Sequence, residues 1–132
     1  MRSTILIAAL AATASPAAAE RNLVPSLGSE PDVCVDRPTE PDWMQNISIR
    51  EAYKRVLVQD IYRAQSMKRI VAANSCACDV RFPPWDAAEA EFRKRFASVE
   101  RWEMLEASDG YNSRANMLRP EAMAICQAAG NW

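Results

Sequence analysis

The sequence predicts an all-α protein: a small helical domain of about three helices, two long and one short near the end of the chain, with an irregular proline-rich N-terminal arm. Disulfides are expected to staple it. Glycine is scarce, at three residues, and the alternation of apolar and polar residues that half-buried strands require is rare. Apolar residues instead recur at helical spacing over two long stretches. Four cysteines supply the staples.

Residues 1–19 have the pattern of a cleaved secretory signal peptide. Arg2 provides the basic start, residues 5–14 form a short apolar run, and Ala17 to Ala19 provide the small-residue cleavage site. We expect cleavage after Ala19, which leaves a mature chain of 113 residues. The apolar run is shorter than the roughly 20 residues of a membrane-spanning helix. The expected location is therefore the periplasm or the exterior, with no stable membrane insertion after cleavage.

The predicted arm covers residues 20–47, and the helical domain covers residues 48–132. Four prolines lie in the arm, at positions 25, 31, 38 and 41. Proline removes a backbone donor and holds the preceding residue in an extended conformation. We therefore expect an ordered or partly ordered irregular segment, which Cys34 would pin to the domain.

The first long helix is expected to run from Ser48 to about Ala73. Ser48 followed by Glu51 fits a capping box, in which each side chain satisfies a backbone amide at the helix start. An apolar stripe follows at helical spacing. Its members are Ile49, Tyr53, Leu57, Ile61, Ala64 and Val71.

A second long helix is expected from Asp86 towards Leu105, after the break that Pro83 and Pro84 impose. The sequence Ser108-Asp109-Gly110 is typical of a helix stop. Pro120 suits the first position of a last short helix, and Gly130 suits the residue just past its end.

The cysteines are Cys34, Cys76, Cys78 and Cys126, and in an exported protein an even count predicts a disulfide framework. A bridge between Cys76 and Cys78 would close a very small, strained ring. Two pairings stay open: Cys34–Cys76 with Cys78–Cys126, or Cys34–Cys78 with Cys76–Cys126. Either one ties the arm and the last helix to the connection between the long helices.

Cys76-Ala77-Cys78 also has a functional interpretation, as a thiol redox pair or a copper site assisted by methionine. Redox pairs favour a helix start, where the dipole lowers a thiolate pKa, whereas this pair follows a helix end. The structural interpretation is therefore preferred. No metal site is predicted.

Four tryptophans are many for a chain of this length. Most are expected to pack in the core or at helix ends. Trp85, which follows Phe82-Pro83-Pro84, and Trp132 are the candidates for an interaction surface, because aromatic anchors dominate protein interfaces.

The absence of histidine excludes the Ser-His-Asp and Cys-His nucleophile designs and the HExxH zinc helix. No glycine-rich phosphate loop or other cofactor motif is present, and no carboxylate pair is marked as catalytic. Without Arg2 the chain carries 15 basic and 17 acidic side chains. That balance provides no general attraction for nucleic acid.

The resulting hypothesis is an exported, non-catalytic, disulfide-stabilised helical protein that acts as an interaction or assembly component in the periplasm or cell envelope. An accessory of a secretion or conjugation apparatus would be one example. The sequence identifies neither its protein partner nor its oligomeric state. The alternatives are a thiol-redox or copper-handling protein that uses Cys76 and Cys78, and a small inhibitor of an extracellular enzyme with Trp85 or Trp132 as its anchor.

Overall fold

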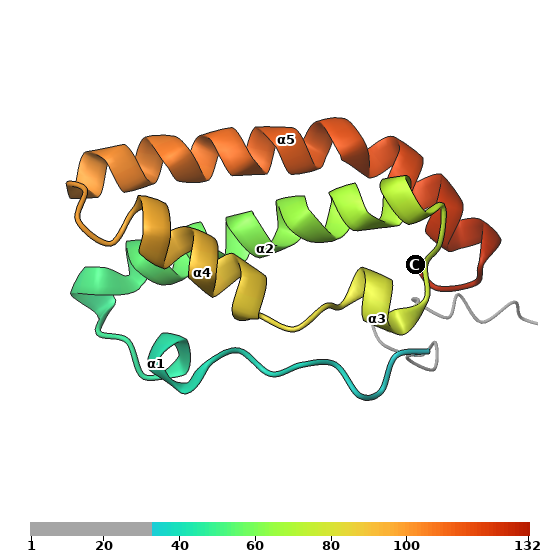
Figure 1. The fold of residues 1–132 in the computed structure, drawn as a ribbon, viewed down its shortest axis with the longest axis horizontal. Helices are drawn as coiled ribbons and strands as arrows, with labels where there is room; N and C mark the ends of the chain where they lie inside the picture. The colour runs from blue at the N-terminus through green and yellow to red at the C-terminus, as the bar shows by residue number, and fades with distance from the viewer. Residues whose placement is uncertain (1–32) are drawn as a thin grey trace, which may run out of the picture. The chain divides into compact units, whose positions relative to one another are not determined.

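The computed structural model of the chain describes residues 33–132, and this part contains helices and no strand (Figure 1). The all-α prediction, with two long helices and two disulfides, is confirmed. The predicted signal peptide and its cleavage site fall among residues 1–32, outside the described part. The elements are α1 (Asp42–Gln45), the 3₁₀ turn η1 (Ile49–Glu51), α2 (Ala52–Ala73), α3 (Cys78–Arg81), α4 (Asp86–Arg95) and α5 (Arg101–Ala128).

The two long helices, α2 and α5, lie side by side and run in the same direction (Figure 1). Residues later in α2 contact residues later in α5, as parallel helices require. Ser108 donates a hydrogen bond to Asp60, and Arg63 donates to Asn112 at 2.5 Å. Further along, Cys76 just beyond α2 is bonded to Cys126 in α5. Because the helices are parallel, residues 74–100 must carry the chain back to the starting end of α2.

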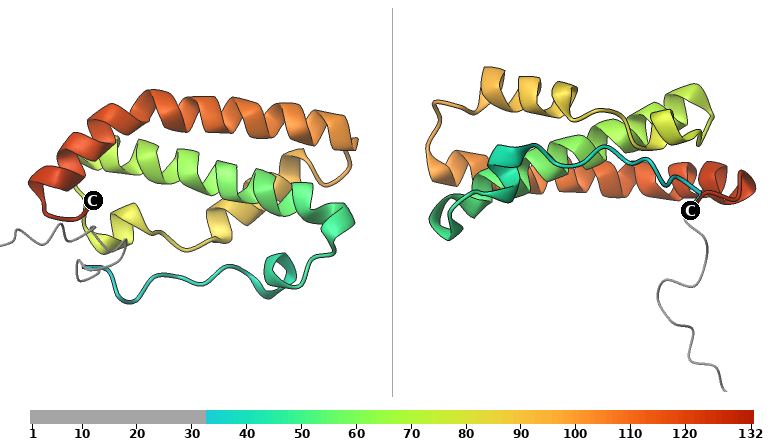
Figure 2. Two further views of the ribbon diagram at one scale, coloured as in Figure 1. Left: turned by 180° about the vertical axis from the view of Figure 1, so that it is seen from behind. Right: turned by 90° about the horizontal axis from the view of Figure 1, so that it is seen from below.

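That returning segment includes α4, which lies across α2 on the side away from α5 (Figure 2). The arm runs back along α3 and α4 before α1 begins. Trp43 of α1 stacks on Phe92 of α4, with 5.9 Å between ring centroids, and its indole donates to Glu89 at 2.7 Å. The arm therefore covers a face of the domain with ordered contacts.

Buried side chains fill the space where α2 meets α1, α4 and α5. Within this core, the rings of Phe96 and Tyr111 pack edge to face, with 6.2 Å between their centroids. A smaller cluster, built around Ile70 and the Cys76–Cys126 bridge, lies at the far end of the long helices. The main core consists of Met44, Leu57, Val58, Ile61, Ala64, Ala88, Phe92, Phe96, Met104, Tyr111 and Ala115.

The first long helix ends at Ala73, as predicted, but its start differs. The turn η1 precedes α2, and the Ser48 side chain makes no capping hydrogen bond, so the predicted capping box is wrong. Glu51 instead pairs with Lys54 at 2.5 Å. Ile49 is 95% exposed, so the apolar stripe begins later than we predicted.

The second long helix is α5, from Arg101 to Ala128, and here the predicted boundaries are wrong. Helix α4 begins at Asp86 as expected but ends at Arg95. A turn follows, and α5 starts where the Glu103 carboxylate accepts from the Glu100 amide at 3.0 Å. The predicted stop at 108–110 and the predicted start at Pro120 both lie inside α5. The last part of α5 bends (Figure 1), as expected where proline removes a backbone donor and crowds the preceding turn.

A continuous buried stripe explains why α5 does not stop at Ser108. Its residues recur every three or four positions along most of the helix. Several are small, which lets α2 approach closely, and Ser108 satisfies its hydroxyl on Asp60. The tertiary contact therefore outweighs the local stop signal. The stripe consists of Met104, Ser108, Tyr111, Ala115, Ala122 and Cys126.

A polar network closes the core between α2, α4 and α5. Glu91 accepts from the Tyr111 hydroxyl, from Gln65 at 2.8 Å and from Arg95 at 2.9 Å. Burial alone would raise the pKa of Glu91, but these three hydrogen bonds outweigh it and lower that pKa. Burial and the bond to Glu91 raise the pKa of Tyr111 to about 12. The pair is thus held as a carboxylate and a neutral phenol.

We predict that Ile61→Ala lowers the free energy of unfolding by about 2–5 kcal/mol, because it leaves a cavity in the packed core. Ile61 is fully buried, whereas Ile49 is 95% exposed. The matched control Ile49→Ala should change stability by no more than about 0.5 kcal/mol. Urea unfolding of both variants measures the difference, and equal effects would contradict the described core.

We predict that Glu91→Gln weakens the acid dependence of stability. The folded-state pKa of Glu91 lies below the ordinary value, so its contribution is complete above about pH 4.5 and is lost as the pH falls through the lower folded-state pKa. The variant should be less stable than wild type near neutral pH and lose less stability on acidification. Unfolding midpoints across the acid range test this, with exposed Glu106→Gln as a control that should follow wild type.

Candidate functional site

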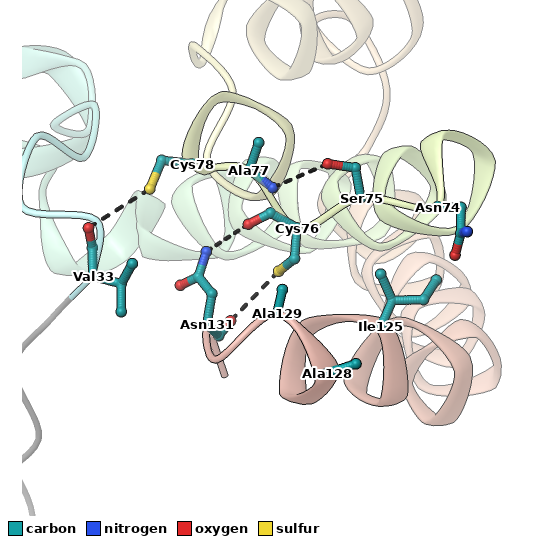
Figure 3. A pocket seen from close by; sticks show the side chains of 10 residues that line it. All are labelled: Val33, Asn74, Ser75, Cys76, Ala77, Cys78, Ile125, Ala128, Ala129 and Asn131. Carbon is teal, nitrogen blue, oxygen red and sulfur yellow. Dashed lines mark hydrogen bonds between the residues drawn. The ribbon is translucent and has the colours of Figure 1, made fainter.

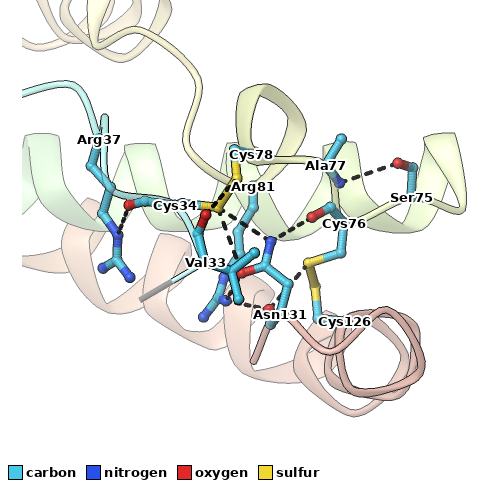
Figure 4. The surroundings of a disulfide bond; sticks show 10 residues. All are labelled: Val33, Cys34, Arg37, Ser75, Cys76, Ala77, Cys78, Arg81, Cys126 and Asn131. Carbon is cyan, nitrogen blue, oxygen red and sulfur yellow. Dashed lines mark hydrogen bonds between the residues drawn. A yellow bond between two sulfur atoms is a disulfide. The ribbon is translucent and has the colours of Figure 1, made fainter. Parts of the chain in front are cut away.

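Two disulfides meet at the far end of the long helices (Figure 4). Cys34 of the arm is bonded to Cys78 at the start of α3, with 5.5 Å between Cα atoms and 44 residues of separation. Cys76 is bonded to Cys126 of α5, with 5.0 Å between Cα atoms and 50 residues of separation. The structure thus selects one of the two pairings that the sequence left open, and residues 33–132 hold no free cysteine.

The chain reaches this point because both long helices end in the same motif. At the end of α2, Asn74 has φ of 45°, and the Ser75 amide donates to the Ile70 carbonyl at 3.3 Å. At the end of α5, Gly130 has φ of 68°, and the Asn131 amide donates to the Cys126 carbonyl at 2.8 Å. This left-handed ending is the Schellman motif, which favours glycine and tolerates asparagine. It turns both segments sharply toward each other.

Asn131 fills the space between the two bridges. It is 6% exposed, and its amide nitrogen donates to the Cys76 carbonyl at 2.6 Å and to the Cys34 sulfur at 3.3 Å. Arg81 donates to the Asn131 side-chain oxygen at 2.9 Å and also to its main-chain carbonyl. One buried amide thus connects the arm, the loop after α2, helix α3 and the segment after α5. We call this group, with the two disulfides, the hub.

Sequence reasoning did not identify Asn131 or Arg81 as members of the hub. Gly130 lies past the end of the last helix, as predicted, and the structure gives it a left-handed conformation. That turn places the next side chain against the cysteines. The position of Asn131, directly after a glycine that ends a helix, was therefore the available sequence signal. Only the disulfide pairing shows which groups Asn131 contacts.

A hollow of about 610 Å³ lies beside the hub (Figure 3). Its lining comes from the arm, the loop after α2 and the last turn of α5. Apart from the bonded cysteines, these residues include no ionisable side chain. Asn74 and Ser75 provide its polar side chains together with Asn131. Such a lining can bind by shape and by amide hydrogen bonds, but it offers no acid or base that could activate the Ser75 hydroxyl.

The Cys76-Ala77-Cys78 sequence does not act as one unit in this structure. Cys76 is 4% exposed and faces α5, whereas Cys78 is exposed and faces the arm. Each sulfur is bonded to a distant partner, so neither supplies a thiolate in this state. Within residues 33–132 no group of three or more potential ligands is placed to hold a metal ion.

Trp85 belongs to the contact between the arm and the domain. Its ring stacks on Tyr62 of α2, with 3.9 Å between centroids, and its indole nitrogen donates to the Pro38 carbonyl at 3.2 Å. The Tyr62 hydroxyl donates to the Pro83 carbonyl at 2.8 Å. One face of the Trp85 ring and its only hydrogen-bond donor are therefore used in contacts within the fold.

Trp132 lies next to Asn131 and is 36% exposed. The guanidinium carbon of Arg81 lies 5.2 Å from its ring centroid, and that of Arg119 lies 5.4 Å away. Arg81 also lies 4.9 Å from the ring of Phe82, and Arg37 lies 4.1 Å from the same ring. These five residues form what we call the aromatic-arginine corner. Its flat stacking contacts are of the cation–π type.

Positive charges near this corner affect the pKa of the Tyr62 phenol. Burial is the largest effect on Tyr62 and raises its pKa, while the positive charges of Arg37 and Arg69 oppose that rise. Two guanidinium groups thus act on Tyr62 from nearby, in a chain whose formal net charge is -1.

Comparison with protein-family models, with curated proteins and with solved structures finds no significant match. None of the helices in residues 33–132 combines the length and apolarity needed to cross a bilayer. The two disulfides are compatible with an extracellular or periplasmic protein.

We predict that removing either bridge destabilises the fold by about 2–5 kcal/mol, the usual cost in a small disulfide-bonded domain. The variants are Cys34→Ser with Cys78→Ser, and Cys76→Ser with Cys126→Ser, so that no lone thiol remains. Urea unfolding measures both. Unchanged midpoints would contradict a structural role for the bridges. In a separate test of the pairing, partial reduction followed by alkylation should label Cys34 and Cys78 together, because these two cysteines share one bond.

Proposed function

We propose that this is an exported, non-catalytic protein that binds a protein partner in the periplasm or cell envelope through its aromatic-arginine corner. Residues 1–19 would direct export, with cleavage after Ala19. An accessory role in a secretion or conjugation apparatus is one setting that fits. The observation that carries the proposal is the rigid presentation of Trp132 beside a disulfide-bonded hub.

Rigidity supports this proposal because binding is weakened by the entropy of ordering a contact surface. Trp132 follows Asn131, which is fixed by hydrogen bonds to Cys76 and Arg81. The same hub holds the arm, and with it Arg37, near the ring of Phe82. The corner is therefore organised before any partner arrives.

Composition supports the same surface. Tryptophan, tyrosine and arginine are the residues most enriched among those that dominate binding energy at protein interfaces. Trp132 and the exposed Arg119 lie together here, beside the hub that the two disulfides stabilise. A second exposed tryptophan, Trp102, is 64% exposed near the start of α5, with no aromatic or guanidinium contact described for it.

The polar chemistry of residues 33–132 favours binding over catalysis. Burial, followed by the hydrogen bond to Glu91, raises the pKa of Tyr111 to about 12, and, against the opposing effect of burial, the hydrogen bonds of the core network lower the pKa of Glu91. Perturbed groups mark an active site when they face a cavity with a role to perform. Tyr111 does line a pocket of about 450 Å³ near the start of α5, but its hydroxyl donates to Glu91 inside the core network. The hollow beside the hub presents amides, a hydroxyl and apolar groups.

We predict that Trp132→Ala abolishes recovery of the partner, whereas Trp102→Ala retains it. A tryptophan anchor at an interface typically contributes about 2 kcal/mol or more, which corresponds to roughly a thirtyfold loss of affinity. The measurement is a non-reducing pull-down from the native envelope fraction, with thermal unfolding of both variants as the folding control. Recovery of wild type only as a free monomer, or equal losses for both variants, would overturn the proposal.

A further inference from the structure

A further, smaller pocket of about 250 Å³ lies beside Trp132, between that residue, α2 and the segment after α3. Met67 and Ile70 of α2 form one wall, and the rings of Tyr62, Phe82 and Trp132 form the others. The pocket is therefore apolar and largely aromatic. Small-molecule sites have this character, with a few polar groups that fix the orientation of the ligand.

Two arginines, Arg63 and Arg81, also line this pocket. Arg63 directs its described hydrogen bonds to neutral side-chain amides, those of Asn112 at 2.5 Å and Asn116 at 2.7 Å. These contacts fix the position of the guanidinium but leave its charge uncompensated by them. A guanidinium has more N–H donors than these two bonds use, and its planar fork matches a carboxylate. A single negative charge beside Arg63 would complement that guanidinium.

Ser66 lies on the same pocket and adds a polar group. The residue is 6% exposed, and its hydroxyl oxygen makes no aligned hydrogen bond to any described residue. It lies near the phenol of Tyr62, whose own proton goes to the Pro83 carbonyl. The hydroxyl thus lies against the phenol oxygen of Tyr62, with which it interacts, and is enclosed by the fold, so it adds polarity to this wall without offering a ligand contact.

We infer that the pocket beside Trp132 binds a small aromatic carboxylate, with the ring between the apolar walls and the carboxylate at Arg63. The flat aromatic walls favour a ring over a branched chain, because offset-stacked and edge-on aromatic contacts contribute beyond buried area. The modest volume favours a single ring. This inference goes beyond the partner proposal and does not depend on it, since it is drawn from the lining of the pocket and needs no protein partner.

The test is a titration of the oxidised full chain with phenylacetate and with phenylacetamide, its neutral analogue, followed by NMR. We expect saturable shifts of the Trp132 indole and the Met67 methyl group at millimolar phenylacetate. Phenylacetamide should bind about three to ten times more weakly, the factor expected for losing a partly exposed charged hydrogen bond. The Trp102 indole, near the start of α5, should not move.

A variant pair tests the assignment to Arg63. Arg63→Gln should weaken phenylacetate binding by about the same three- to tenfold factor and leave phenylacetamide unaffected. Exposed Arg50→Gln in η1 is the matched control and should bind as wild type does. Equal affinity for the two ligands, shifts centred on Trp102, or no saturable shift would each overturn the inference. The ligand comparison in wild type remains decisive even if Arg63→Gln alters the fold.

Discussion

The parallel alignment of α2 and α5 is the constraint on which the rest of the structure depends. Two adjacent parallel helices oblige the intervening chain to return along the full length of the first, so residues 74–100 cannot be a short turn. That return produces α3 and α4, and α4 covers the face of α2 that α5 leaves open. The contact between Asp60 and Ser108 aligns the two helices near their middle, and the Cys76–Cys126 bridge aligns their far ends.

The far end of this pair acquires its chemistry from helix termination. Both long helices finish with a left-handed residue, Asn74 or Gly130, and each turn directs the following segment toward the other. A buried amide, that of Asn131, is then shared by the loop after α2, the arm and Arg81. Backbone geometry, rather than a cluster of reactive side chains, thus creates the surface that we propose for binding. Buried polar groups that are fully satisfied hold a unique arrangement in this way.

Local rules recovered the parts of the fold that local interactions control. The end of α2 at Ala73, the start of α4 at Asp86 and the left-handed Gly130 all follow from residue type and spacing. The extent of α5 does not, because its buried stripe uses the small residues Ser108, Ala115 and Ala122, whose hydrophobic signal is weak and whose burial depends on tertiary contacts. The four cysteines and Trp132 of the candidate site could be named from sequence, and Trp85, also named, belongs instead to the contact between the arm and the domain. The pairing and the roles of Asn131, Arg81, Arg63 and Ser66 depend on contacts between distant segments.

The spacing of Cys76 and Cys78 has a consequence for oxidative maturation. The two pairings open to this chain are isomers that differ only by an exchange of partners between positions two residues apart, and thiolate attack interconverts such isomers. Local sequence does not distinguish them, so the choice is made by packing: the Cys76 sulfur is buried against α5, while Cys78 faces outward to the arm. Asn131 fits between the bridges of the native isomer and binds the carbonyl of Cys76. The native disulfide pairing is therefore favoured only once the tertiary structure has formed.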